Sequence, residues 1–291
     1  MKLIARGQTI EWPRRPLVMG IVNLSLDSFS GDGLADVDSA VEKARAMIAD
    51  GADIIDIGAE SARTNRPPIS EAEEAAQLTK FIERWPSVAS PAPPASGSDP
   101  ASPPLLSINT WRPAVARAAL HCGGHILNDI GALPTDENAR ICADTGAALL
   151  IMHSIGQPKI AHTHVGYDDV MWRIEAFFTE KIALAKRAGV SGDALILDPG
   201  IDFAKQRSDN LRIYRELDRL AKFERPILLP VSRKTVIGEV LGISEPAARD
   251  AGAVACIVHA MLRGAAIFRV HNVRAAAQTI RIIRAVETGR R

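Results

Sequence analysis

The sequence predicts an α/β protein folded as a (β/α)8 TIM barrel, preceded by an N-terminal β-hairpin. Two observations support this fold class. Eight short apolar runs, rich in β-branched residues, recur along the 291 residues, and amphipathic helix patterns separate them. Continuous apolar runs that alternate with helices are typical of parallel strands covered on both faces. Eight strand–helix repeats favour a closed barrel.

An open, doubly wound sheet is the structural alternative. It is less favoured because none of the runs is followed by the glycine fingerprint of dinucleotide-binding folds. The number of runs also matches the eight strands of a barrel.

In chain order, the first expected element is a hairpin at LIARGQTIEW (3–12), which we expect to close the floor of the barrel. The eight expected strands follow it: LVMGIVN (17–23), DIIDIGAE (53–60), LLSINT (105–110), HILNDI (125–130), ALLIMH (148–153), LILDPG (195–200), PILLPVS (226–232) and AIFRVH (266–271).

Helix signals lie between these runs. The stretch at 37–51 ends on Gly51, and the stretch at 167–189 ends on Gly189, as helices with a C-cap glycine do. The stretch at 70–85 begins with Ser70 and Glu73, the spacing of a capping box.

A segment rich in Pro, Ala and Ser interrupts this pattern at about residues 86–104. Such a composition cannot bury a core and predicts an extended surface excursion. The strand–helix alternation continues on both sides of it. We therefore expect a single domain over residues 1–291, with a surface insertion instead of a domain boundary.

Composition excludes several classes of protein. The formal net charge of +1 gives no electrostatic basis for binding nucleic acid or a membrane surface. No stretch approaches the roughly 18 apolar residues of a membrane span, and the N-terminus lacks the apolar core of a signal peptide. The three cysteines are scattered, which argues against a disulfide frame or a metal cluster. A cytoplasmic location is the expectation.

Catalytic groups of TIM barrels lie at the carboxyl ends of the strands. Each expected strand here ends in a hydrogen-bonding or charged group: Asn23, Glu60–Ser61, Asn109, Asn128–Asp129, His153, Asp198, Ser232–Arg233–Lys234 and Arg269–His271. Any one of them is compatible with an ordinary turn or cap. Together they predict a polar mouth over an apolar barrel.

Two kinds of chemistry are represented in that mouth. Acceptors, amides and one cation suit a flat heterocycle with N–H donors and a carbonyl, and come from Asp198, Asn128, Asn109 and Lys234. Cations from two different loops suit an anion or phosphate clamp: Arg63, Arg269 and His271. No Ser-His-Asp order or clustered metal-ligand spacing is present. The isolated histidines are interpreted as surface or structural residues: His121, His153, His162 and His164.

Seven motifs resemble, in order, those of dihydropteroate synthases: MGIVNLSLDSFSGDG, DIGAESAR, LNDIGAL, IMHSIGQP, ILDPGIDFAK, SRKTVIG and FRVHNV. The resemblance extends from about Leu17 to Val273. It is highly specific for the pterin-binding superfamily and less specific for the exact activity.

The resemblance implies an enzyme that joins 6-hydroxymethyl-7,8-dihydropterin diphosphate to p-aminobenzoate, releases diphosphate and uses Mg2+. A homodimer is a further family expectation. The implied pterin ligands are Asp198, Asn128, Asn109 and Lys234, and the implied diphosphate ligands are Arg63, Arg269 and His271. Asn23 is the implied Mg2+-linked residue, and the arylamine is expected to meet Phe29, Ser232 and Arg233. Lys234, Asp198 and Arg63 are the implied catalytic residues.

The chain departs from the family pattern at several positions. Asn109 replaces an aspartate, Leu26 replaces a proline of the first loop, and Ala62 and Thr64 replace a threonine and a proline of the second. Asp202 and Ala204 stand where the family has glycines.

These departures leave three alternatives open. A paralogue with remodelled loops would use a ribosylated aniline in a methanopterin-type pathway. A pterin-dependent methyltransferase shares the barrel and often uses asparagine in its pterin site, which fits Asn109, but it has no need for a diphosphate clamp. A non-catalytic pterin-binding protein is the third alternative.

Overall fold

The barrel closes as predicted. The computed structural model describes residues 1–12, 14–24, 36–60, 68–89, 103–160 and 165–289. Its eight-stranded parallel sheet has the order β8-β7-β6-β5-β4-β3-β10-β9. An isolated parallel bridge between Leu197 of β8 and Ile227, the residue before β9, joins the two edges of the sheet. The strands are β3 (Leu17–Asn23), β4 (Ile54–Gly58), β5 (Leu105–Asn109), β6 (Ile126–Asp129), β7 (Ala148–Met152), β8 (Leu195–Asp198), β9 (Leu228–Pro230) and β10 (Ile267–Val270).

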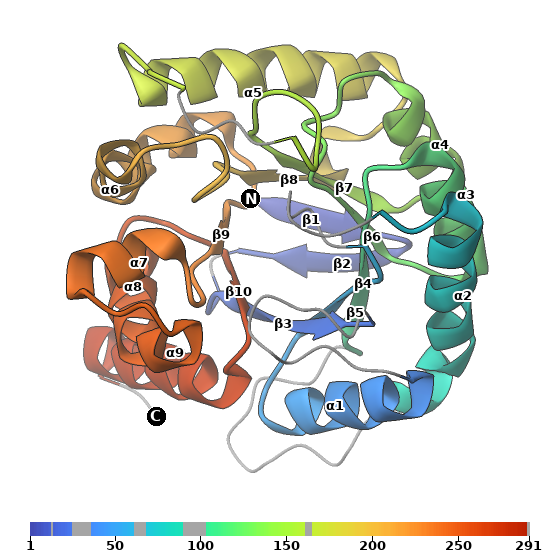
Figure 1. Ribbon diagram of the computed structural model, residues 1–291, viewed down its shortest axis with the longest axis horizontal. Coiled ribbons are helices and arrows are strands. Elements are labelled where there is room, and N and C mark those ends of the chain that lie inside the picture. The colour runs from blue at the N-terminus through green and yellow to red at the C-terminus, as the bar shows by residue number, and fades with distance from the viewer. Residues whose placement is uncertain (13, 25–35, 61–67, 90–102, 161–164, 290–291) are drawn as a thin grey trace.

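Helices form a ring outside the barrel (Figure 1). They are α1 (Val37–Ala49), α2 (Glu71–Val88), α3 (Pro113–Cys122), α4 (Glu137–Thr145), α5 (Val170–Arg187), α6 (Arg207–Arg215), α7 (Thr235–Leu241), α8 (Asp250–Met261) and α9 (Val273–Thr288). Short 3-10 helices are η1 (Gly192–Ala194), η2 (Leu217–Phe223) and η3 (Pro246–Arg249). Ser70 accepts a hydrogen bond from the Glu73 amide, as the capping pattern predicts. Gly51 and Gly189 follow α1 and α5 with positive φ.

The second helix is longer than expected. The sequence predicts an end at Trp85, but α2 continues through Pro86 to Val88. Trp85 and Val88 are both buried against the core, and this packing outweighs the one backbone hydrogen bond that a proline removes. The expected insertion boundary at residue 86 is therefore corrected: residues 86–88 are helical, Ala89 is the C-cap, and residues 90–102 lie outside the described part of the chain.

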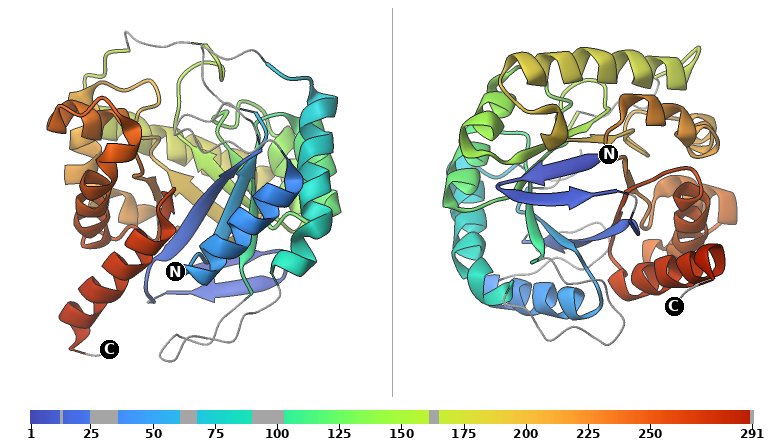
Figure 2. Two further views of the ribbon diagram at one scale, coloured as in Figure 1. Left: turned by 60° about the horizontal axis from the view of Figure 1, so that its bottom comes forward. Right: turned by 180° about the vertical axis from the view of Figure 1, so that it is seen from behind.

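The N-terminal hairpin closes the floor. Strands β1 (Lys2–Ala5) and β2 (Gln8–Glu11) pair antiparallel and lie across one end of the barrel (Figure 2, right). The Arg6 amide donates to the carbonyl of Gly146 at 2.7 Å, and the Arg6 guanidinium donates to the carbonyl of Leu120 at 2.8 Å. Both carbonyls lie at the carboxyl ends of outer helices. The opposite end, where the strands terminate, is left for the site.

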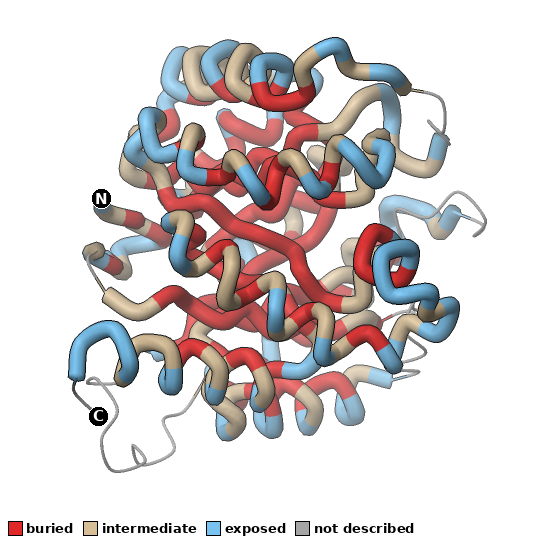
Figure 3. The backbone as a smooth tube through the Cα atoms, turned by 90° about the vertical axis from the view of Figure 1, so that its left-hand side faces the viewer, coloured by how far each residue is buried: buried red, intermediate tan, exposed pale blue. Residues whose placement is uncertain are grey.

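The core is continuous from the strands to the inner faces of the helices (Figure 3). Strands β5, β6, β7 and β8 are buried along their whole length. Burial of both faces explains why these runs are continuously apolar and do not alternate.

We predict that replacing residues 90–102 with a short Gly/Ser linker leaves the thermal unfolding midpoint within a few degrees of the wild-type value. The composition of this segment buries little apolar surface, and closure entropy changes slowly with loop length. Ala89 is kept because its amide donates to Trp85. Differential scanning calorimetry checks the result, and a cooperative loss of stability would show that the segment packs on the barrel.

Candidate active site

A tight turn at the end of β8 presents Asp198 to the mouth of the barrel. One Asp198 carboxylate oxygen accepts from the Gly200 amide at 2.7 Å. Gly200 has φ +72°, and a Cβ there would collide with the carbonyl oxygen of His153. Only glycine fits this position. The Asp-Pro-Gly sequence thus turns the chain and fixes the buried carboxylate of Asp198.

Burial makes the ionised form of Asp198 energetically unfavourable. Burial raises the pKa of Asp198 to about 6, although the Gly200 amide and the cations Lys234, Lys205 and Arg269 act to lower it. A carboxylate held in this way favours a ligand that donates hydrogen bonds to it.

Lys234 reaches the same turn from the next loop. It is the N-cap residue of α7, and its Nζ donates to the carbonyl of Ile201 at 2.8 Å. Nζ also lies 5.0 Å from the ring centre of Phe203. Burial lowers the pKa of Lys234, and the carboxylates of Asp202 and Asp198 oppose that shift. Lys234 and Asp198 thus lie close enough to affect each other's pKa, and their role as pterin ligands stays a prediction.

A second lysine, Lys205, contacts His153 and the loop that follows the Asp198 turn. Lys205 Nζ lies 2.9 Å from His153 Nδ1 and donates to the carbonyl of Phe203 at 3.0 Å. Burial lowers the pKa of Lys205 to about 7 and that of His153 to about 2. His153 is therefore a neutral structural residue, consistent with one of its two expected roles.

An unpredicted carboxylate, Asp56 of β4, connects most of the remaining predicted residues. Its side chain is fully buried and accepts from Ser107 Oγ at 2.6 Å and from Arg269 Nε at 2.7 Å. Asn128 Nδ2 lies 3.2 Å from both oxygens, and Asn109 Nδ2 lies 3.4 Å from one of them. Four donors from three strands thus converge on one anion.

Asp56 lies in the middle of a strand, so a search confined to strand ends passes over it. The signal was a single carboxylate inside the otherwise apolar run DIIDIGAE. Because side chains alternate along a strand, Asp56 shares one face with Ile54 and Gly58, and its contacts with β5, β6 and β10 place this face inside the barrel.

Two predicted residues of neighbouring strands meet at the rim. His271 Nδ1 lies 2.9 Å from Ser232 Oγ, and the His271 amide also donates to this hydroxyl. Arg233 has φ +58° and its Nε donates to Asp250 of α8 at 3.2 Å. The structure therefore joins Ser232 to the expected diphosphate ligand and ties Arg233 to a helix.

Fewer contacts with the site are described for the remaining predicted residues. Asn23 ends β3 opposite Gly58 in the strand register. Arg63 and Phe29 lie outside the described residues, as do Leu26, Ala62 and Thr64. Asp129, beside Asn128, faces away from Asp56 and accepts from Asn138 Nδ2 at 2.9 Å.

A buried ion-pair cluster anchors the residues on either side of 61–67. Glu60 pairs with Lys159 and lies 3.5 Å from Arg112, and its other contact is the Ile69 amide at 2.8 Å. Arg112 also binds Glu74 at 2.8 Å. Burial raises the pKa of Glu74, and the Arg112 cation opposes that rise. Sequence reasoning assigned Glu60 to the mouth but missed its partners, which come from distant loops.

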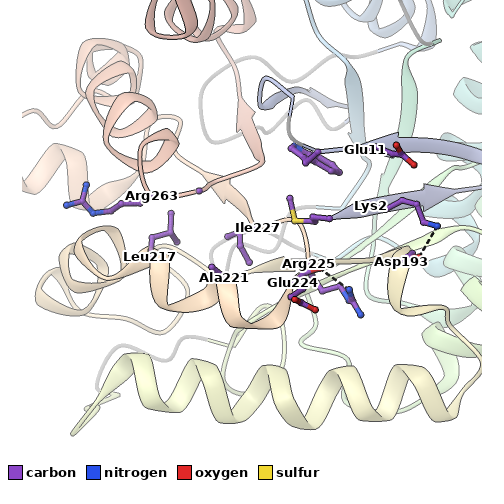
Figure 4. A pocket seen from close by; sticks show the side chains of 12 residues that line it. Lys2, Glu11, Asp193, Leu217, Ala221, Glu224, Arg225, Ile227 and Arg263 are labelled. Carbon is purple, nitrogen blue, oxygen red and sulfur yellow. Dashed lines mark hydrogen bonds and ion pairs between the residues drawn. The ribbon is translucent and has the colours of Figure 1, made fainter. Parts of the chain in front are cut away.

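A cleft of about 690 Å3 lies at the other end of the barrel (Figure 4). Residues of the hairpin and of η2 line it, including Glu11, Leu217 and Ala221, and Lys2 pairs with Asp193 there at 3.2 Å. This end of a barrel usually serves stability. The candidate site is therefore the mouth.

In the part of the chain that the structure describes, no three His, Cys, Asp or Glu side chains are grouped so that they could hold a metal ion. None of the helices in this part has the length and apolar character that a membrane crossing requires.

Comparison with known proteins agrees with the geometry. The family model described as pterin binding enzyme matches residues 19–271. The dihydropteroate synthase of Escherichia coli is 35% identical, over 98% of this chain and 96% of that protein. The chain belongs to the dihydropteroate synthase family. A structure of the Yersinia pestis dihydropteroate synthase with a sulfonamide drug superposes with a TM-score of 0.87 at 36% identity, covering 100% of both chains.

A dihydropteroate synthase of Xanthomonas albilineans, solved with 4-aminobenzoic acid, has a TM-score of 0.84 at 32% identity. It covers 99% of this chain and 98% of its own. The same enzyme solved with 7,8-dihydropteroate has a TM-score of 0.83 at 33% identity, with 99% of each chain covered.

Two departures from the dihydropteroate synthase motifs have a structural explanation. Asp202 and Ala204 have φ of +67° and +50°, the left-handed conformation for which glycine is the usual residue. Both residues thus adopt a backbone conformation that glycine adopts without strain. Asn109 acts as a donor to Asp56, a role that an ionised aspartate cannot fill.

We predict that Asp198→Asn stabilises the fold by about 3 kcal/mol at pH 8 and by much less at pH 4. The folded-state pKa is raised to about 6 from 3.8, so only well below pH 4 is the carboxyl protonated in both states. Stability is lost as pH rises from 4 to 6, because the unfolded chain ionises first. The amide avoids this cost.

Urea unfolding at the two pH values measures the difference. Asp144→Asn, at an exposed position of α4, is the matched control and should change stability by no more than about 0.5 kcal/mol. Equal stability of the wild-type and Asp198→Asn proteins at pH 8 would show that the carboxylate carries no net burial cost.

Proposed function

We propose that the chain catalyses the condensation of 6-hydroxymethyl-7,8-dihydropterin diphosphate with p-aminobenzoate, releasing diphosphate, as a step of folate biosynthesis. The observation that carries the proposal is the buried carboxylate of Asp198 with the partly buried Lys234 beside it, since Lys234 Nζ donates to the carbonyl of Ile201 in the turn that follows Asp198. Relatives about one third identical over nearly the whole chain are named dihydropteroate synthase, which supports it.

The pterin would bind at the base of the mouth. Asp198 would accept from a ring N–H and the exocyclic amino group, which are adjacent donors on one edge of the heterocycle. Asn128 would face the same ring, and Lys234 would donate to the carbonyl edge. The Asp56 network holds Asn128 and Asn109 in place for this role.

The diphosphate would lie at the rim beside Arg269 and His271, with Arg63 contributed by the second loop. Asn23 would help to hold Mg2+, which binds oxygen ligands and keeps few protein contacts when phosphates are present. The amide oxygen of Asn23 fits this preference. When bound, Mg2+ would neutralise charge on the leaving group.

The arylamine would enter between the loops, near Ser232, Arg233 and Phe29. Its nitrogen attacks the methylene carbon of the pterin as the bond from that carbon to the diphosphate oxygen breaks. The nitrogen then loses a proton. An electron-rich dihydropterin stabilises positive charge at the methylene, so no strong protein base is needed. Positioning and electrostatic stabilisation are the main contributions of the protein.

The described contacts weaken the methyltransferase alternative. Asn109 suggested that class, but its hydrogen bond to Asp56 gives the amide a role inside the barrel. Arg269 lies in β10 and His271 follows this strand, so two cationic or hydrogen-bonding side chains at one strand end support a diphosphate site. A methyl transfer has no use for such a set.

We also propose a cytoplasmic homodimer. Large apolar side chains are exposed on α7, at Val240 and Leu241, and on α9, at Ile282 and Val286. Ile282 and Val286 are one helical turn apart and form a stripe. Exposed apolar surface of this kind supports association with a second copy.

We predict that Arg269→Gln weakens binding of the pterin diphosphate by about tenfold or more, and binding of unphosphorylated 6-hydroxymethylpterin by less than about threefold. Glutamine is chosen because its amide can still donate to Asp56, whereas alanine would leave that buried charge unpaired. Isothermal titration calorimetry with Mg2+ present measures both ligands. Equal losses would assign Arg269 a structural role and favour a function without diphosphate.

We predict weak activity with p-aminobenzoate, and a several-fold gain when Ala62→Thr and Thr64→Pro are introduced together. A proline-stiffened loop organises a small planar substrate better, whereas a looser loop admits larger arylamines. Steady-state diphosphate release checks this, and pterin affinity should not change in the double variant. Micromolar KM and ordinary turnover in the wild-type enzyme would show that these loop substitutions are neutral and would dismiss the ribosylated-aniline paralogue.

A further inference from the structure

Asp202 occupies a position where glycine is the family residue, and it makes contacts that glycine cannot make. It lies in the loop between β8 and α6, with φ +67°. Aspartate tolerates this conformation better than most residues but less well than glycine. A strained aspartate in place of a glycine calls for a compensating interaction of its side chain.

That interaction is with a different loop. The Asp202 carboxylate accepts from the Thr235 amide and, at 3.3 Å, from the Val236 amide. These are the first two residues of α7, whose own N-cap residue, Lys234, provides no side-chain capping bond. Asp202 therefore caps the helix from outside, satisfying amides that begin a helix without a partner.

Asp202 is itself held firmly. Asn210 of α6 is buried, and its side chain accepts from the Asp202 amide at 2.9 Å and donates to the Asp202 carboxylate at 3.2 Å. Asn210 thus fixes the Asp202 carboxylate relative to α6, and the same carboxylate contacts α7.

The capped residues adjoin Lys234. Lys234 Nζ donates to the carbonyl of Ile201, the neighbour of Asp202. On the other side, the buried Arg249 guanidinium donates to the carbonyls of Arg233 at 3.1 Å and Lys234 at 3.2 Å. Arg249 thus holds the carbonyl of Lys234, and Asp202 holds the amides of the two residues that follow it.

We propose that Asp202 is a positioning residue for the pterin pocket: by capping α7 from the β8–α6 loop, it fixes Lys234 against Asp198. This role rests on the proposed function, in which Lys234 is a pterin ligand. Asp202 acts through the backbone of α7 and is not a catalytic residue, because its carboxylate is directed at amides of the protein.

The test compares Asp202→Gly and Asp202→Asn with the wild-type protein. Glycine suits φ +67° and removes the cap, so folding is preserved while the contact is lost. Asparagine keeps one accepting oxygen and removes the charge. Asp169→Gly is the matched control, because Asp169 caps α5 through the Trp172 amide at 2.9 Å and is not part of the pocket.

Two measurements are made on each protein. Amide hydrogen exchange, followed by mass spectrometry of peptides covering 231–241, reports on the α7 segment without any ligand. Calorimetric titration with 6-hydroxymethylpterin reports on the pocket. We expect Asp202→Gly to speed exchange at 235–236 and to weaken pterin binding about five- to tenfold, with Asp202→Asn intermediate. Asp169→Gly should lower the melting temperature but leave both readouts unchanged.

Unchanged exchange and unchanged affinity in Asp202→Gly would overturn the proposal. Faster exchange with unchanged affinity would also overturn it, because the cap would then be purely structural. If the wild-type protein bound no pterin at all, the proposed function would fail, and the exchange data alone would still decide whether Asp202 fixes α7.

Discussion

The interior of the barrel is organised around the buried carboxylate of Asp56. A buried anion is tolerated only when donors surround it, and here a guanidinium, a hydroxyl and two amides do so. These donors include Arg269, Asn109 and Asn128, which are the residues that line the mouth. Their positions are consequently not independent of one another. A change at any one of them alters the balance of charge and hydrogen bonds for the others.

Asn109 is one of these donors. The family has an aspartate at this position, and an ionised aspartate cannot donate a hydrogen bond to Asp56. Asn109 instead donates to Asp56 and adds no charge. Asp56 and Arg269 thus set the total charge of the barrel interior. Asp198 and Lys234 supply most of the charged groups on the pterin side of the mouth.

The fold and half of the mouth were predictable because each depends on a local pattern. Apolar runs identify the strands, and the residues that follow them identify Asp198, Lys234 and His271. Asp56 was not predicted, since its importance comes from contacts with strands distant in sequence. The continuation of α2 through Pro86 depends on the burial of Val88, which no local propensity encodes. The pairing of Arg233 with Asp250 likewise arises from the packing of α8.

The sheet has its weakest junction between β8 and β9, which we call the seam. Strand β9 has three residues, and it meets β8 through the single bridge of Leu197 with Ile227, supported by the Leu197 amide on the carbonyl of Pro226. Other neighbouring strands pair over longer ladders, as β3 with β4, β4 with β5 and β6 with β7 do. Asp198 is the next residue after Leu197, and Lys234 follows β9, so a ligand held by both residues spans the seam. A ligand held by both residues would connect the two edges of the sheet, and binding to the folded state alone would raise its stability.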